Sequence, residues 1–188
     1  MIMVAFYTVN TPYEEEVKGL IESCKKFNIR FDVRGFKSRG SWRLNSNIKT
    51  EFIRDMLDEH KEDVLHLDAD ARFRKSPVLF INEFPHDIGV YFRNDTKPLC
   101  GTIYFKNNDR VKEMVQRWIK EQSKYPGTSN QKIFKRVLKY QCDDLKLDVC
   151  NIPPSYTQIY DTMKNFGEPV IEHMQASRRF KFCSMPAQ

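Results

Sequence analysis

Residues 64–73 read VLHLDADARF, in which four residues typical of a buried strand are followed directly by Asp68 and Asp70. In open α/β sheets, ligands bind outside the carboxyl ends of the strands, which is where these two aspartates fall. At a spacing of two in an extended segment, both carboxylates point the same way and can hold one divalent cation or one polyol. A D-x-D triplet arising by chance is the alternative interpretation.

Strand-like and helix-like segments alternate on both sides of this stretch. Residues 2–9 form a near-continuous apolar run, typical of a strand buried on both faces, and residues 12–27 read as a helix with acids at its start and lysines at its end. The other expected strands are 29–36, 87–92, 101–107 and 147–153, and the other expected helices are 49–57, 109–122 and 129–140. The alternation predicts an α/β fold, parallel at least in its first half, in a single domain over residues 1–188.

The chain is basic, with 31 Lys and Arg against 25 Asp and Glu, a net charge of +6 and a pI near 9.0. This balance favours anionic partners such as nucleotides or nucleic acid, although a soluble basic protein without such partners has the same composition. Basic side chains form one face of the helix predicted at 129–140, and the loop RGFKSRGSWRL (34–44) mixes basic and aromatic residues. A nucleic-acid-binding module is therefore one hypothesis, and a solvated helix face is its alternative.

Several classes of protein lack support in the sequence. The five cysteines form no C-x-x-C pair, so neither a disulfide framework nor a zinc ribbon is indicated, and reduced thiols are expected. The N-terminus has no basic n-region, and no apolar run approaches the length of a membrane span, so a cytoplasmic protein is expected. The motifs of P-loop NTPases, dinucleotide-binding dehydrogenases and serine hydrolases do not occur.

Two further side chains are unusually placed. Lys49 heads the apolar stripe of its helix, where a buried ammonium needs an anion such as phosphate, unless its stem packs while its head reaches water. His173 follows an apolar stretch and precedes two arginines, and near the aspartates its imidazole could complete a mixed oxygen and nitrogen site that suits Mn²⁺ or Mg²⁺. A lone histidine in the core is the structural alternative.

Taken in order, these segments resemble the nucleotide-diphospho-sugar transferases of the GT-A fold. The resemblance is carried by the N-terminal strand and helix, a strand ending near Asp32, the helix with Lys49, and the segments LDADARF (67–73), CGTIYFKNN (100–108), NQ (130–131), NIPPSY (151–156) and His173. It covers nearly the whole chain, in a compact form similar to phage or bacterial members. It implies a single Rossmann-like domain with a mixed, mainly parallel central sheet flanked by helices, and the host cytoplasm as the location of a phage-encoded protein.

The resemblance also implies roles for individual residues. The implied metal ligands for Mn²⁺ or Mg²⁺ are Asp68, Asp70 and His173, with Asp68 sharing metal or ribose contacts. The residues implied to bind the nucleotide and the donor sugar are Thr8, Asn10, Asp32, Lys49, Asp68, Gly101, Thr102 and Arg178. Within this set, the first three would hold the base and ribose, Lys49 would meet the diphosphate, and Gly101 and Thr102 would face the donor sugar.

Asn130 and Gln131 occupy the place where the family often has an Asp-Gln pair, and they are the implied catalytic residues. Asn130 departs from that pattern and cannot act as a base, so retention at the anomeric carbon is the predicted stereochemical course. The carboxylates left as bases for an inverting attack, none of them within a motif, are Asp87, Asp95, Glu168 and Glu172.

The function implied by the resemblance is metal-dependent transfer of a sugar from a nucleoside-diphosphate sugar, expected to be a UDP-sugar, to an acceptor hydroxyl. The basic helix face suggests a hydroxymethylated base in DNA as the acceptor. The competing hypothesis is a basic nucleic-acid-binding module that has the fold without the activity. The sequence indicates neither the oligomeric state nor the identity of the sugar.

Overall fold

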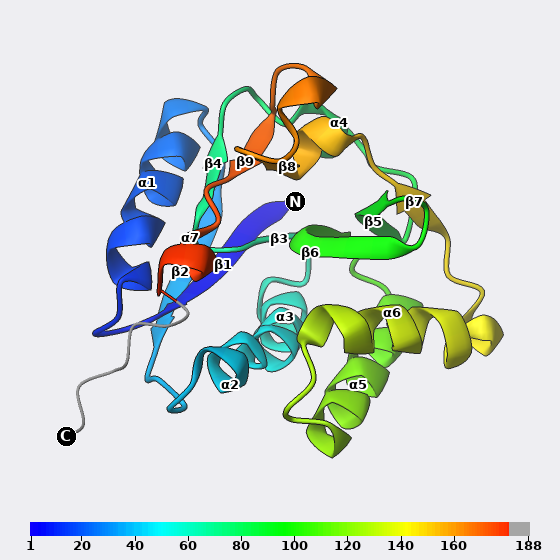
Figure 1. The fold of residues 1–188 in the computed structure, drawn as a ribbon. Helices are drawn as coiled ribbons and strands as arrows, with labels where there is room; N and C mark the ends of the chain where they lie inside the picture. The colour runs from blue at the N-terminus through cyan, green and yellow to red at the C-terminus, as the bar shows by residue number, and fades with distance from the viewer. Residues whose placement is uncertain (181–188) are drawn as a thin grey trace.

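The computed structural model describes residues 1–180 and is built around one six-stranded sheet (Figure 1). The strands are β1 (Ile2–Thr8), β2 (Phe31–Phe36), β3 (Val64–Leu67), β5 (Ile88–Arg93), β6 (Lys97–Phe105) and β7 (Val149–Asn151), in the order β2-β1-β3-β6-β5-β7. Pairs β1–β2, β1–β3 and β5–β7 are parallel, whereas β6 pairs antiparallel with both β3 and β5. The predicted mixed and mainly parallel sheet is confirmed, because β6 alone among these strands runs against the others.

A second, three-stranded sheet joins the end of the chain to its middle. It contains β4 (Ala71–Phe73), β9 (Ile171–His173) and β8 (Gln158–Ile159) in the order β4-β9-β8. Strands β4 and β9 are antiparallel, and their register places Ala71 opposite His173. Because β4 follows the two aspartates directly, this pairing brings the late histidine next to them.

Helices cover both faces of the central sheet. On one face lie α2 (Trp42–Ser46), α3 (Ile48–His60), α5 (Asp109–Lys124) and α6 (Asn130–Tyr140), and on the other lie α1 (Tyr13–Lys26) and α4 (Val78–Ile81) (Figure 1). The remaining helical segments are η1 (Asp143–Leu145), η2 (Pro154–Tyr156), η3 (Lys164–Phe166) and α7 (Ala176–Phe180). None of the helices within residues 1–180 combines the length and the apolar character that crossing a membrane requires.

The apolar residues form two main clusters, one on each face of the sheet. Helix α5 shows most clearly how helical periodicity builds one of these clusters. Its buried positions Val111, Met114, Val115 and Trp118 belong to the same cluster as the buried residues of α3 and α6. Trp118 packs against Phe134 of α6 with ring centroids 4.6 Å apart. The cysteines of the described chain, at positions 24, 100, 142 and 150, are free, and Cys183 lies outside the described residues.

His66, in the middle of β3, is a buried group whose charge state couples folding to pH. It is fully buried, and neither ring nitrogen has a hydrogen-bond partner among the described residues. Burial, reinforced by the nearby Lys49 ammonium, lowers the pKa of His66 from 6.5 to about 3. The folded protein therefore keeps this imidazole neutral at pH values where the unfolded chain protonates it.

We expect His66 to make the protein less stable as the pH falls from about 6.5 toward 3, because only the unfolded chain gains the proton in that range. The contribution to the free energy of unfolding is at most about 1.4 kcal/mol per pH unit. Urea unfolding of the wild type and of His66→Leu at a series of pH values measures it. The two curves of stability against pH should diverge below about pH 6.5, and parallel curves would contradict the prediction.

Candidate functional site

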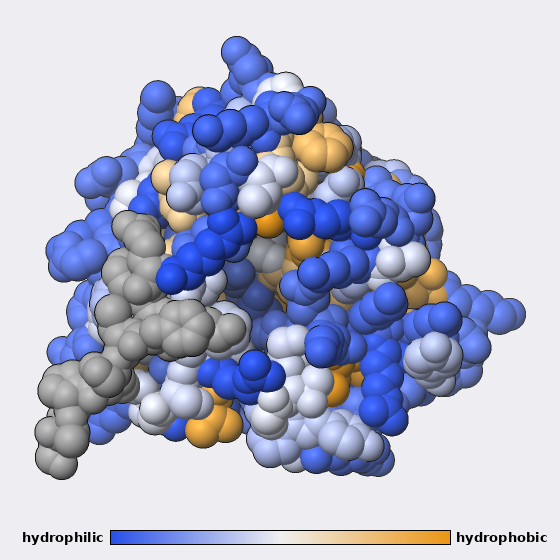
Figure 2. All heavy atoms as spheres, in the orientation of Figure 1, coloured by the Kyte–Doolittle hydropathy of each residue, from blue (hydrophilic) through white to orange (hydrophobic). Residues whose placement is uncertain are grey.

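A cavity of about 420 Å³ opens at the carboxyl ends of β1 and β3, the size of a small-molecule site. Its walls include the end of β1, the turn after β3, the start of β6, the end of β9 and the first turn of α7. Figure 2 shows this face of the molecule hollowed near its centre, with hydrophilic residues around the hollow and both hydrophilic and hydrophobic ones within it. The cavity therefore lies where open α/β sheets place their ligands.

The two aspartates after β3 lie in a turn and not in the extended segment that their spacing suggested. The Ala71 N–H donates to the Asp68 carbonyl at 2.9 Å, which closes the turn, and the Asp68 N–H donates to the Gly101 carbonyl at 2.9 Å. The turn carries the chain from β3 of the central sheet into β4 of the second sheet. Both carboxylates still line the same cavity.

Asp70 is held rigidly and ionised. Its side chain is 10% exposed and accepts a hydrogen bond of 2.7 Å from the Ala176 N–H at the start of α7. Burial disfavours the charged form of Asp70, but His173, the Ala176 amide and Arg72 outweigh it, so the pKa of Asp70 lies below its ordinary value. The carboxylate is thus a fixed negative charge at the base of the cavity.

His173 stands beside Asp70 with its two ring nitrogens in different roles. Its Nδ1 lies 3.7 Å from Asp70 Oδ1, and its Nε2 lies 2.8 Å from the Thr102 hydroxyl. A Cβ atom built at Gly101 would approach His173 Cε1 to 2.8 Å. Gly101 therefore leaves room for the ring and also lines the cavity. The fully buried Thr102 does not line the cavity and instead holds the orientation of the ring, contrary to the expectation that it faces the donor sugar.

Lys49 meets a carboxylate of the site itself. Its ammonium lies 2.7 Å from Asp68 Oδ1 and donates to the Cys100 carbonyl at 2.7 Å. Because the Lys49 side chain is 5% exposed, the alternative in which its head reaches water does not apply. The buried cation holds the more exposed of the two aspartates in place.

Together Asp68, Asp70 and His173 have the composition of a divalent-metal site. Ligand atoms from the three residues lie within 4.8 Å of one another. Two carboxylates and one imidazole suit Mn²⁺ or Mg²⁺, which keep further positions for water or phosphate oxygens. The residues present therefore fit the ion that the sequence predicts. With Nδ1 as the histidine ligand, Nε2–H would donate to the Thr102 hydroxyl.

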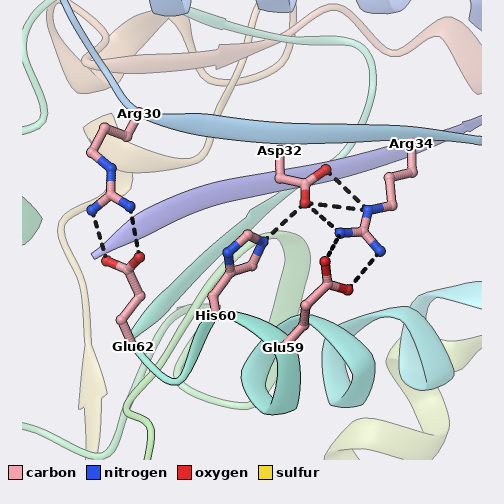
Figure 3. A network of polar contacts seen from close by, with 6 residues as sticks. All are labelled: Arg30, Asp32, Arg34, Glu59, His60 and Glu62. Carbon is pink, nitrogen blue, oxygen red and sulfur yellow. Dashed lines mark hydrogen bonds and ion pairs between the residues drawn. The ribbon is translucent and has the colours of Figure 1, made fainter.

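Asp32 does not reach the cavity, contrary to expectation. The parallel register pairs Val4 with Asp32 and Thr8 with Phe36, so Asp32 lies four residues, about 13 Å, before the edge of the sheet where the cavity opens. Its carboxylate is engaged by Arg34 at 2.6 Å and by His60 at 2.9 Å (Figure 3). Hydrogen bonds from these two residues outweigh partial burial and hold the pKa of Asp32 below its ordinary value.

The ion-pair network in Figure 3 also accounts for a second group of potential ligands, Asp32, Glu59 and His60. Arg34 bridges both carboxylates, at 2.6 Å to Asp32 and 2.7 Å to Glu59, and so supplies the positive charge that an ion would otherwise provide.

Asn10, the other expected ribose contact, is exposed and does not line the cavity; its N–H donates to Glu14 at 2.8 Å.

The residues expected at the site fall into two groups, those that line the cavity and those that do not. Those that line the cavity are Thr8, Lys49, Asp68, Asp70, Gly101, Asn130, Gln131, His173 and Arg178. Asn130 is oriented by a hydrogen bond of 2.8 Å from its Nδ2 to the Ser46 carbonyl, and Arg178 pairs with Asp161. None of the four carboxylates considered as bases for an inverting attack lines the cavity. Asp87 accepts a hydrogen bond from the Asp148 N–H, and Asp95 lies in an exposed turn. Glu168 forms an ion pair with Lys75, and Glu172 forms one with Arg74.

Other residues that line the cavity had weaker signals in the sequence. Tyr13 and Trp42 meet through a hydrogen bond of 3.0 Å from the indole Nε1 to the phenol oxygen, and both border the cavity with Tyr7. Trp42 belongs to the basic and aromatic loop noted in the sequence. Arg93 and Lys97 also line the cavity and flank the β5–β6 turn. Their signal in the sequence was a pair of basic residues on either side of an Asn-Asp sequence that is typical of a turn.

The hydroxyl of Thr102 is expected to set the metal affinity of the site through His173. Replacing Thr102 with valine keeps the side-chain shape but removes the hydrogen-bond partner of His173 Nε2. Loss of such a partner typically lowers metal affinity 10- to 100-fold, and we expect a loss of Mn²⁺ affinity of roughly 30-fold, near the middle of that range. Mn²⁺ titration of the variant and of Thr96→Val, on an exposed turn, measures the change. Equal affinities in the two variants would exclude the role of the hydroxyl.

An α/β sheet with a cavity at its carboxyl edge is the arrangement that GT-A-like nucleotide-sugar transferases have. The chain belongs to the nucleotide-diphospho-sugar transferases, because the model of that family matches residues 28–184. No protein with a curated description matches the sequence.

Solved structures of glycosyltransferases share the fold. A glycosyltransferase involved in glycosylation of the major capsid of PBCV-1 aligns with a TM-score of 0.71 and 13% identity, covering 93% of each chain. GlyE from Streptococcus pneumoniae TIGR4 aligns with a TM-score of 0.65 and 13% identity over 92% of this chain and 54% of that one. Mouse xyloside xylosyltransferase 1 aligns with a TM-score of 0.53 and 8% identity, over 94% and 98%. The present chain thus has the size of some of these proteins and about half the length of GlyE.

Proposed function

We propose that this protein, acting as a single domain, transfers a sugar from UDP-sugar to an acceptor hydroxyl in a reaction that depends on Mn²⁺ or Mg²⁺. The observation that carries the proposal is the grouping of Asp68, Asp70 and His173 within 4.8 Å of one another at the cavity. A cation held there would neutralise charge on the departing diphosphate. Family membership supports the nucleotide-sugar donor.

The chain's own residues would bind and orient the donor. Asp70 and His173 are fixed by the Ala176 amide and the Thr102 hydroxyl, so their positions are set before a ligand arrives. Lys49, which neutralises Asp68, keeps that carboxylate from repelling the diphosphate. Asn130 and Gln131 also line the cavity, where their amides would hydrogen-bond the hydroxyl groups of the donor sugar.

We propose retention at the anomeric carbon. Among the described residues that line the cavity, only Asp68 and Asp70 carry carboxylates, and both belong to the proposed metal site. An inverting attack commonly uses a separate carboxylate to take the proton from the acceptor. The stereochemistry of the product, read by NMR, tests this proposal, and an inverted product would overturn it.

We propose a hydroxymethylated base in DNA as the acceptor. The exposed lysines 132, 135 and 139 on α6 support it, because they form a basic strip that a DNA backbone can contact. Incubation of UDP-sugars with duplex DNA that carries such bases, followed by mass spectrometry, is the test. If no UDP-sugar labels the DNA while the protein binds UDP, the acceptor is of another kind.

Titration calorimetry with UDP, in Mn²⁺ and then in EDTA, tests the donor and the metal together. We expect binding with Mn²⁺ and a large loss of affinity in EDTA. No binding by folded protein would refute the proposed function. A pure nucleic-acid-binding module would instead bind DNA with steep salt dependence and would be indifferent to UDP and Mn²⁺.

A further inference from the structure

Two cations face each other across the β5–β6 hairpin at the cavity. The register pairs Arg93 with Lys97, and the chain turns between them through Asn94 and Asp95, whose φ angles are 51° and 56°. Asn and Asp tolerate this left-handed conformation, so the turn is tight and places the two cations on adjacent strands. Both side chains line the cavity.

The two charges are not neutralised within the described part of the chain, where neither Arg93 nor Lys97 forms an ion pair or a side-chain hydrogen bond. The other cations of the cavity differ, since Lys49 pairs with Asp68 and Arg178 pairs with Asp161. Like charges directly opposite each other on paired strands are destabilising. An anion bound between them would relieve that repulsion.

The hairpin and the metal ligands lie at different positions along β6. Lys97 begins β6 and Gly101, beside His173, lies four residues further along, which corresponds to about 14 Å of strand. The apolar Leu99 lies between them and packs with Ile159 and Met163. The backbone of the hairpin is thus set back from the metal ligands along β6, and UDP titration of the hairpin variant decides whether its cations meet the acceptor or the donor diphosphate.

We propose that Arg93 and Lys97 bind an anionic group, a phosphate or a carboxylate, on the acceptor, so that the enzyme selects negatively charged acceptors. This inference rests on the proposed function, since it assigns the acceptor side of the same cavity. The planar guanidinium can bind either oxyanion with two parallel hydrogen bonds, and the lysine adds a point charge. A DNA phosphodiester and a phosphorylated or acidic sugar share this chemistry.

The test uses the double variant Arg93→Gln/Lys97→Gln and, as a matched control, Lys25→Gln/Lys26→Gln, which removes the same charge from the exposed end of α1, away from the cavity. A third variant, Lys132→Gln/Lys135→Gln, removes the charge from the basic strip on α6. Calorimetry in saturating UDP and Mn²⁺ compares glucose, glucose 6-phosphate, glucuronate and a short DNA duplex as probes. We expect the wild type to prefer the anionic sugars to glucose, and the hairpin variant to lose on the order of 100-fold in affinity for them. Duplex binding lost in the hairpin variant identifies DNA as a source of the anion, and duplex binding lost only in Lys132→Gln/Lys135→Gln assigns DNA to α6.

Three results would overturn the inference. The first is equal affinity for glucose and the anionic sugars, and the second is an equal loss in the hairpin variant and in the control. The third is weaker UDP binding in the hairpin variant, which would assign the cations to the donor diphosphate and leave the proposed function intact. Failure of the wild type to bind UDP would instead refute the proposed function, and sulfate titration of the hairpin variant and the control would still test the anion site itself.

Discussion

Asp70→Asn is expected to abolish Mn²⁺-dependent binding of UDP while leaving the fold intact. The amide keeps the size of the carboxylate and can still accept the hydrogen bond from the Ala176 N–H, so the chain around it has no reason to rearrange. It loses the charge that a hard cation requires. Because residues that merely support a ligand change metal affinity 10- to 100-fold, removal of the ligand itself should cost at least about 100-fold.

Calorimetry with UDP and Mn²⁺ measures this loss, and thermal unfolding checks the fold. Asp95→Asn is the matched control, since it makes the same chemical change in an exposed turn where the φ of 56° suits asparagine equally well. The control should bind as the wild type does. Unchanged Mn²⁺-dependent binding in Asp70→Asn would remove the metal site from the proposal.

Gly101→Ala, which adds a single methyl group, is expected to disrupt the metal site. The added Cβ would come within 2.8 Å of His173 Cε1, a distance at which the ring must move. Movement of the ring would also break the hydrogen bond between Nε2 and Thr102, which holds it at 2.8 Å. We expect Mn²⁺ affinity to fall at least about 100-fold, as for loss of a ligand and its partner together.

A double-mutant cycle separates this role from the role that the resemblance implies. If Gly101 makes room for the histidine, then Gly101→Ala should have little further effect on Mn²⁺ or UDP binding in a His173→Ala background. If the glycine instead lets the backbone approach the donor sugar, the two substitutions should weaken binding of the UDP-sugar independently. Calorimetry with UDP and with UDP-glucose on the four proteins distinguishes the two outcomes.

The order of elements and the main parts of the site could be predicted from the sequence. Apolar runs such as 2–9 and helical stripes such as the one ending at Trp118 depend on local periodicity, which the chain carries by itself. The place of Asp68 and Asp70 followed from the same reasoning, because a residue at the end of a parallel strand lies at the carboxyl edge wherever its strand sits in the sheet.

What only the tertiary structure decided was register and pairing. Asp32 follows the start of a strand closely, and only its register with β1 shows that it lies about 13 Å from the edge. His173 is separated from Asp70 by a hundred residues of chain, and the pairing of β9 with β4 brings them together. Such contacts depend on how distant segments pack, which local periodicity does not encode. The sequence by itself therefore determined the class of fold and the place of the two carboxylates, whereas the tertiary structure decided the placement of Gly101 and Thr102 beside His173 and the pairing of Arg93 with Lys97.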